Sequence, residues 1–184
     1  MYTDNKQNRH LAGTALRWVT PKIINHQYMD FYTNDHGGFI IRIYGIMIND
    51  KKEVLLSDEY RFGMLMTKFP GGGLKYGEGP EDCLHREALE ELGQEVEIIQ
   101  HFYTTGFYQK ALFHEEKQLI SIYYLITPKG RIKFAVSGKL YDFPEKQEGS
   151  ISFRWKKICS IEPEDLTFPV DRFVAKMLKE QHCR

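Results

Sequence analysis

The sequence predicts an α/β fold, a sandwich in which helices pack on a mixed β-sheet. Three observations favour this class: apolar, β-branched runs typical of strands, one internal segment with clear helix-start and helix-stop residues, and an amphipathic C-terminal segment. Strands on both sides of one internal helix, followed by a final helix, are typical of α/β sandwiches. A chain of 184 residues, 42% of them hydrophobic, can form one domain with a substantial core.

The expected strands are short apolar segments bounded by turn residues. Residues 39–48 (FIIRIYGIMI) are the clearest example. Together with the turn at 49–52 and a strand at 53–57, they are expected to form a hairpin. Further strands are expected at 64–69, 95–109, 119–127 and 151–158.

The internal helix is expected at residues 80–92. Pro80 suits the first helical position, where a missing N–H costs nothing, and Glu81 and Asp82 favour the positive end of the helix dipole. Gly93 is suitably placed to end the helix in a left-handed conformation. These local signals define both ends of the helix.

The two ends of the chain differ in character. An amphipathic helix is expected at 171–181, and its apolar face is formed by Phe173, Val174, Met177 and Leu178. At the other end, the turn at 34–38 separates an N-terminal extension, residues 1–36, from a main domain at 37–184. Within the extension, residues 22–32 fit either a strand or a short helix.

Composition argues against several classes of function. The 25 basic and 25 acidic residues cancel, whereas nucleic-acid-binding and membrane-surface proteins usually show a basic excess, so neither partner is expected. The start of the chain is polar, unlike a signal peptide, and no apolar run could span a bilayer. Cys83, Cys159 and Cys183 are odd in number and share no CxxC spacing, which argues against a disulfide framework and a structural zinc site. A cytoplasmic protein with reduced cysteines is therefore expected.

Three glutamates lie along one edge of the internal helix. At 3.6 residues per turn, Glu87, Glu90 and Glu91 fall within about a third of the circumference, beside the face that would pack on the sheet. Such close like charges repel one another, and a bound divalent cation would turn the repulsion into ligation, because Mg²⁺ prefers hard oxygen donors. Taken alone, the triplet is more typical of a solvated acidic helix face.

A glycine-rich segment before the helix changes this interpretation. The strand at 64–69 is expected to end in a loop at residues 70–73, which contains Gly71, Gly72 and Gly73. Consecutive glycines usually mark a backbone that bends sharply or approaches a ligand closely. A helix start next to such a loop also offers backbone N–H groups to an anion. The loop and the acidic helix together indicate a functional site.

The spacing of these residues resembles the Nudix box of the Nudix hydrolases. The matching positions are, in order, Gly72, Glu78, Arg86, Glu87, Ala88, Glu90, Glu91 and Gly93. Gln94 stands where the box usually ends in an aliphatic residue, which is a departure at a packing position. The resemblance implies that residues 37–184 are a Nudix hydrolase domain, with a Nudix-type α/β/α sandwich around a mixed β-sheet.

The resemblance also implies a metal site and a catalytic role for the helix glutamates. Glu87, Glu90 and Glu91 would ligate Mg²⁺, for which Mn²⁺ could substitute, and the carbonyl of Gly72 or its neighbour Gly71 would add a ligand. The residue matching Glu87, or a neighbour, would orient or deprotonate the attacking water. A carboxylate in this position is a suitable general base because a bound metal lowers the pKa of water.

Other residues have supporting roles in the resemblance. The backbone at 71–73 would contact the phosphates, and Glu78 and Arg86 would support the loop and helix, with Arg86 in an ion pair with Glu78 or Glu90. Many family members recruit a further acid from a downstream loop. Glu148, just before the strand at 151–158, is the first candidate for this ligand, followed by Glu115, Glu116 and Glu145.

The implied reaction is Mg²⁺-dependent hydrolysis of a pyrophosphate bond by metal-activated water. The expected substrate is a small nucleoside diphosphate derivative, and the alternative is a nucleoside triphosphate. A nucleotide-sensing Nudix module without catalysis is a further alternative, but such modules usually lack box glutamates that this chain retains. The intact box also argues against a prenyl diphosphate isomerase. The extension before Phe39 resembles that of nucleotide-sugar hydrolases, which implies a homodimer.

Overall fold

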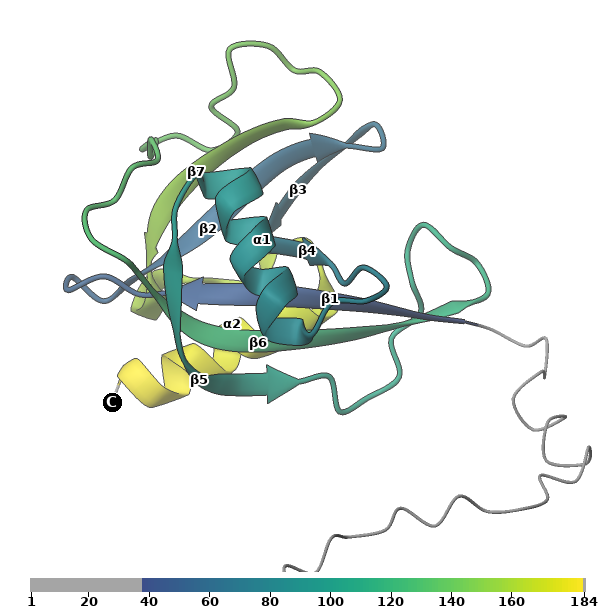
Figure 1. Ribbon diagram of the computed structural model, residues 1–184. Coiled ribbons are helices and arrows are strands. Elements are labelled where there is room, and N and C mark those ends of the chain that lie inside the picture. Colours follow the sequence, from purple (N-terminus) through teal and green to yellow (C-terminus); the bar gives the residue numbers. More distant parts are fainter. Residues whose placement is uncertain (1–37, 184) are drawn as a thin grey trace, which may run out of the picture. The chain divides into compact units, whose positions relative to one another are not determined.

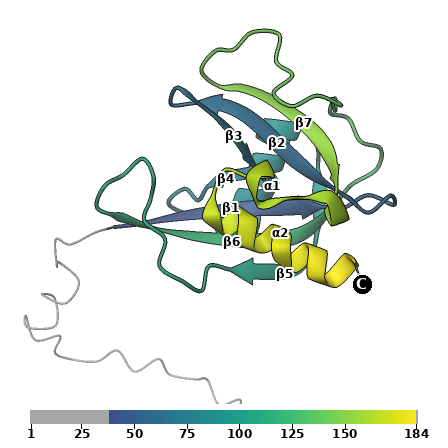
Figure 2. The same cartoon turned by 180° about the vertical axis from the view of Figure 1, so that it is seen from behind.

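The computed structural model describes residues 38–183, so the predicted extension at 1–36 lies outside this part of the chain and stays a prediction, as does the domain boundary. Within the described part, helices α1 and α2 cover opposite faces of a layer of β-strands (Figure 1, Figure 2). This arrangement confirms the predicted fold class. The elements are β1 (Gly38–Met47), β2 (Glu53–Arg61), β3 (Met64–Lys68), β4 (Gly71–Gly73), α1 (Pro80–Leu92), β5 (Val96–Thr104), β6 (Lys117–Pro128), β7 (Ser150–Lys157) and α2 (Pro169–His182).

The strands form two sheets in the described part of the chain. The larger sheet has the order β4-β1-β6-β5 and is mixed, because β1 runs parallel to β6 while the outer pairs are antiparallel. The smaller sheet is antiparallel, with the order β3-β2-β7. Each strand expected from the sequence has a counterpart, but β2 continues to Arg61 and β5 ends at Thr104.

The predicted hairpin between residues 39–48 and 53–57 is wrong. After the turn at 49–52 the chain passes to the smaller sheet, and the two segments pair through an isolated bridge between Ile48 and Val54. The reason is that β4 and β6 already occupy both edges of β1. Strand β2 therefore pairs with β3 and β7 instead.

Strand β1 is buried on both faces and contributes to two separate cores. Ile43 and Met47 pack with residues of α1, whereas Tyr44 packs with residues of α2. The alternation follows from strand geometry, since successive side chains point to opposite faces. Gly45 lies at a crowded point of this strand, because a Cβ there would be 2.4 Å from Cδ1 of Ile126 on β6. Strand β1, with which β4 pairs, is thus tightly packed on both faces.

Helix α2 begins at Pro169, two residues earlier than predicted, and proline suits this first turn. Val174 and Leu178 are buried, as predicted. The prediction for Phe173 is wrong, because its side chain is 40% exposed and its ring packs on the ring of Tyr103 at the margin of the core. Phe173 directly precedes Val174, which belongs to the buried face of the helix together with Val170 and Leu178.

The expectation of reduced cysteines is wrong for two of the three. Cys159 and Cys183 form a disulfide, with 5.6 Å between their Cα atoms, that joins the turn η2 (Ile158–Ser160) to the end of α2. Their separation of 24 residues carries no local signal, and helix α2 brings them together by its packing. Cys83 is buried on α1 and unpaired. No helix among residues 38–183 has the length and apolarity needed to cross a bilayer.

A buried carboxyl group lies in the first turn of α2. The hydroxyl of Tyr123 donates a hydrogen bond of 2.6 Å to Oδ1 of Asp171, and Oδ2 has no hydrogen-bond partner within the described residues. Burial raises the pKa of Asp171 to about 7, because the charged form loses its hydration. The folded protein therefore holds this proton over a pH range in which the unfolded chain has released it.

The Asp171 carboxyl is expected to make folding stability depend on pH. Its stabilising contribution is complete below the ordinary aspartate pKa of about 4 and is lost as the pH rises towards about 7. In urea unfolding between pH 4.5 and 8, the difference in unfolding free energy between the wild type and Asp171→Asn should fall by up to ~1.4 kcal/mol per pH unit up to about pH 7. Parallel pH profiles for the two proteins would contradict this assignment.

Candidate active site

Strand β4 places three glycines at the edge of the larger sheet. The expected loop at residues 70–73 is wrong in this respect, since Gly71–Gly73 pair with β1 as a short antiparallel strand. Gly71 has a φ of 131°, which residues with a Cβ rarely adopt. A Cβ at this position would also lie 2.2 Å from the carbonyl oxygen of Ile43. Glycine is therefore required at the point where β4 meets β1.

The carboxylate of Glu87, on helix α1, packs directly against this strand. A Cβ on Gly72 would lie 2.4 Å from the carboxyl carbon of Glu87, so the glycine makes room for that side chain. The close approach expected at the glycines is thus made by the protein's own helix. The Glu87 side chain is 12% exposed, and its Oε1 accepts a hydrogen bond of 2.6 Å from Nη1 of Arg86.

One turn further along α1, Glu91 also contacts strand β4. Its Oε2 accepts a hydrogen bond of 2.9 Å from the backbone N–H of Gly71, and its Oε1 lies 3.4 Å from Nζ of Lys68. Burial raises the pKa of the Glu91 carboxyl above its ordinary value, although the Lys68 ammonium acts in the opposite direction. Two carboxylates from adjacent helical turns therefore rest on two adjacent glycines.

Lys68, at the end of β3, links this site to the smaller sheet. Its buried ammonium donates a hydrogen bond of 2.8 Å to the carbonyl oxygen of Gly71 and forms an ion pair with Glu59 on β2, with 2.7 Å between Nζ and Oε1. Burial alone would lower the pKa of Lys68, but the carboxylates of Glu91 and Glu59 raise it above its ordinary value. The lysine consequently remains charged although its side chain is only 4% exposed.

Arg86 forms the second cationic centre of the site. Its guanidinium donates to both carboxylate oxygens of Glu78, at 2.5 and 2.9 Å, and to Oε2 of Glu90, at 3.0 Å. It also donates to the carbonyl oxygen of Gly73, at 3.0 Å. The ion pair expected with Glu78 or Glu90 forms with both. Hydrogen bonding by Arg86 lowers the pKa of Glu78 to about 2, so this carboxylate stays ionised.

Each helix carboxylate is thus balanced by a cation of the protein itself. Glu90 is the most exposed of the three, and its Oε1 lies 3.5 Å from Nζ of Lys75. The donor chemistry fits Mg²⁺, since carboxylate and backbone carbonyl oxygens are hard ligands. Nevertheless, no three His, Cys, Asp or Glu side chains of residues 38–183 converge as a ready metal site. A divalent cation would therefore have to replace contacts that Arg86 and Lys68 now make.

The downstream acid has a different partner from the one expected. Glu148 accepts a hydrogen bond of 3.0 Å from the backbone N–H of Phe62, in the turn between β2 and β3. This contact gives no support to a role as metal ligand, which stays a prediction. Glu115, Glu116 and Glu145 are exposed side chains.

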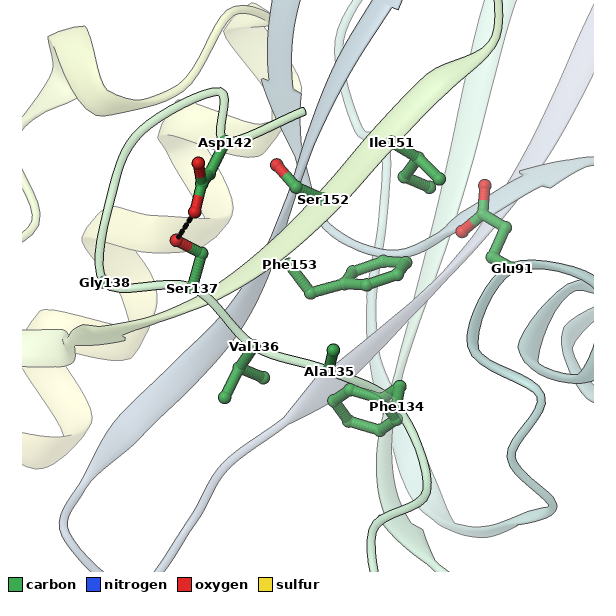
Figure 3. Close-up of a pocket in the computed structure, with 10 residues that line it drawn as sticks. All are labelled: Glu91, Phe134, Ala135, Val136, Ser137, Gly138, Asp142, Ile151, Ser152 and Phe153. Carbon is green, nitrogen blue, oxygen red and sulfur yellow. Dashed lines mark hydrogen bonds between the residues drawn. The ribbon is translucent and has the colours of Figure 1, made fainter. Parts of the chain in front are cut away.

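A cleft of about 570 Å³ lies beside Glu91. One wall is the segment 134–142 and another is strand β7, as Figure 3 shows. The aromatic rings of Phe134 and Phe153 meet edge to face at 5.8 Å within this lining. The lining residues are Glu91, Phe134, Ala135, Val136, Ser137, Gly138, Asp142, Ile151, Ser152 and Phe153.

Sequence reasoning missed three parts of this site: the cleft wall at 134–142, Lys68 and Glu59. The wall has no regular secondary structure, so no periodicity marks it. A signal for the ion pair existed, because Lys68 is a charged residue at the end of a mostly apolar strand, three positions before the first glycine. Its partner could not be identified, since the pairing of β2 with β3 was not predicted.

Solved structures of other proteins share this fold. The Escherichia coli ORF135 protein superposes with a TM-score of 0.56 and 16% identity, over 80% of this chain and 94% of its own. The MutT protein of Methanosarcina mazei Go1 gives a TM-score of 0.53 and 21% identity, over 80% of this chain and 98% of its own. At these identities the likeness concerns the fold alone.

Sequence comparison identifies relatives of part of the chain. An RNA pyrophosphohydrolase of Acinetobacter baylyi is 39% identical over 66 residues, which are 36% of this chain and 39% of the relative. An RNA pyrophosphohydrolase of Hamiltonella defensa is 30% identical over 74 residues, which are 40% of this chain and 44% of the relative. The chain thus spans less than half the length of these relatives. The NUDIX domain family model, by contrast, matches residues 39–176, most of the chain including β4 and α1. The chain therefore belongs to the NUDIX domain family.

Proposed function

We propose that this chain is a Mg²⁺-dependent hydrolase that cleaves the pyrophosphate bond of a small nucleoside diphosphate derivative. The observation that carries the proposal is the contact of two carboxylates with two glycines. Glu87 lies against Gly72, and Glu91 accepts the N–H of Gly71, next to a cleft of about 570 Å³. Family membership supports this class of reaction.

The charges of the site support a requirement for a cation. A pyrophosphate is polyanionic, and the acidic edge of α1 would repel it. Glu87, Glu90, Glu91 and the carbonyl oxygen of Gly72 would hold Mg²⁺, or Mn²⁺ in its place. The bound ion would neutralise charge on the leaving group and lower the pKa of a coordinated water. Glu87 would orient that water, and its hydrogen bond from Arg86 and its packing on Gly72 support this role.

The cleft is suited to the part of the substrate that carries no charge. Phe134, Val136, Ile151 and Phe153 contribute apolar surface to a lining that also has polar groups, among them Glu91 and the exposed Asp142. Figure 3 shows these two carboxylates on different sides of the cleft. Asp142 would repel phosphate groups from its side of the cleft, whereas a nucleoside has apolar faces and neutral polar edges that can be accommodated.

The named relatives favour a second candidate substrate. Because the partial matches are to RNA pyrophosphohydrolases, a pyrophosphate bond at the 5′ end of an RNA is the alternative. A nucleoside triphosphate and a sensing role without cleavage are the remaining alternatives from the sequence. The homodimer and the cytoplasmic location also stay predictions.

A substrate panel tests the proposal directly. The purified chain with Mg²⁺ would be incubated with nucleoside diphosphate derivatives, nucleoside triphosphates and a 5′-triphosphorylated RNA oligonucleotide, and products would be separated by chromatography. The proposal predicts release of a nucleoside monophosphate from at least one nucleoside diphosphate derivative. Cleavage of the RNA alone would contradict the proposed substrate and support the second candidate, a pyrophosphate bond at the 5′ end of an RNA. Binding of a compound without cleavage would favour the sensor.

Glu91→Gln is expected to reduce turnover with little change in structure. The glutamine oxygen can still accept the N–H of Gly71, but the negative charge is lost. Loss of one charged metal ligand is expected to lower kcat by at least ~100-fold, equivalent to about 2.7 kcal/mol. Glu97→Gln, at an exposed position of β5, is the matched control and should retain activity. Near-normal turnover of Glu91→Gln would remove this residue from the metal site.

Val136→Asp is expected to weaken substrate binding through the cleft. The variant adds a third carboxylate to a lining that already contains Glu91 and Asp142. The KM for the cleaved compound should rise ~10-fold, with kcat changed much less, because the contact is with a part of the substrate that does not react. Val136→Thr, which has the same shape and no charge, is the control. An unchanged KM in Val136→Asp would place the nucleoside elsewhere.

A further inference from the structure

The ammonium of Lys68 is surrounded by three oxygen atoms from different strands and a helix. These are Oε1 of Glu59 at 2.7 Å, the carbonyl oxygen of Gly71 at 2.8 Å and Oε1 of Glu91 at 3.4 Å. Carboxylate and carbonyl oxygens in this arrangement are what a hard cation binds. The Lys68 ammonium therefore occupies a group of oxygen atoms next to the proposed metal site.

Two of these three oxygens belong to residues that surround the proposed divalent ion. Glu91 is a proposed ligand, and Gly71 directly precedes Gly72, whose carbonyl is another. An ammonium and a divalent cation on the same Glu91 carboxylate would repel each other strongly, because the Lys68 and Glu91 side chains are only 4% and 16% exposed and water screens their charges little. Binding of the divalent ion to Glu91 therefore requires the Lys68 ammonium to withdraw.

Glu59 provides the position to which the ammonium can withdraw. It makes the shortest of the three contacts, and its side chain is 7% exposed on β2. The hydroxyl of Ser57 donates a hydrogen bond of 2.9 Å to the same carboxylate. Burial alone would raise the pKa of Glu59, but the Lys68 ammonium and the Ser57 hydroxyl hold it below its ordinary value. Glu59 thus remains a fixed negative charge for Lys68.

We propose that Lys68 is a built-in competitor for the divalent cation, and that Glu59 limits this competition by holding the ammonium away from Glu91. The inference rests on the proposed function, because it assumes a divalent ion at Glu91. Lys68 and Glu59 then set how tightly the chain binds that ion. Neither residue touches the substrate, and both are positioning residues.

The competition predicts opposite effects for two variants. Glu59→Gln removes the charge that draws Lys68 away, so the ammonium should bind Glu91 more closely and weaken Mn²⁺ binding about tenfold. The double variant Glu59→Gln/Lys68→Met removes both charges of the buried pair. It frees Glu91 and the Gly71 carbonyl, and it should bind Mn²⁺ more tightly than the wild type, again about tenfold. A purely structural role for the pair would weaken binding in both variants.

Mn²⁺ affinity would be measured without substrate, by the electron paramagnetic resonance signal of free Mn²⁺. Lys51→Met is the matched control, since it removes an exposed ammonium in the turn at 49–52, outside the proposed metal site, and it should change the affinity much less. Thermal unfolding would establish that each variant is folded. If Glu59→Gln does not fold, Glu59→Asp shortens the carboxylate while keeping its charge, and should weaken Mn²⁺ binding in the same direction.

The outcomes separate this inference from the proposed function. Weaker binding by the Glu59 variant together with tighter binding by the double variant supports the competition, even if the wild type cleaves no compound of the panel. Equal affinities in a wild type that binds Mn²⁺ and cleaves a panel compound overturn the competition alone. Absence of Mn²⁺ binding in all variants overturns both the competition and the metal-dependent function.

Discussion

The packing of the acidic edge of α1 on the glycines of β4 is the contact on which the site depends. The carboxyl group of Glu87 occupies the space that a side chain at position 72 would need, and Glu91 accepts the N–H of Gly71. Strand β4 in turn pairs with β1, whose side chains enter both cores. The position of the carboxylates is therefore set by the centre of the fold, not by a mobile loop.

Charge compensation is the second constraint. Carboxylates so close together, and partly buried, would repel one another unless cations lay between them. Arg86 supplies one such charge towards Glu78, Glu87 and Glu90, and the buried Lys68 supplies another towards Glu91. Under the proposed function, these two cations would have to yield some of their contacts to a divalent ion. Stability and metal affinity would then be coupled in this site.

Local signals in the sequence predicted the ends of helix α1 correctly. Helix α1 has the predicted ends, because Pro80 and Gly93 act within a single turn. Non-local features were not predictable in this way. The predicted hairpin of residues 39–48 and 53–57 was wrong because strand pairing depends on which sheet edges are free. The disulfide of Cys159 and Cys183 was not predicted because it depends on how helix α2 packs. The glycines and glutamates of the site were identified by their spacing, whereas Lys68, Glu59 and the cleft depend on tertiary contacts.

The most direct test of a cation site between β4 and α1 is the effect of substoichiometric Mn²⁺ on the amide nuclear magnetic resonance spectrum of the protein. A paramagnetic ion broadens signals of nearby amides. The signals of Gly71, Gly72 and Gly73 and of residues 87–91 should broaden first, and excess Mg²⁺ should restore them. Broadening confined to other segments, such as the exposed acids at 115–116, would contradict a cation site at this contact, as would a spectrum that Mn²⁺ leaves unchanged.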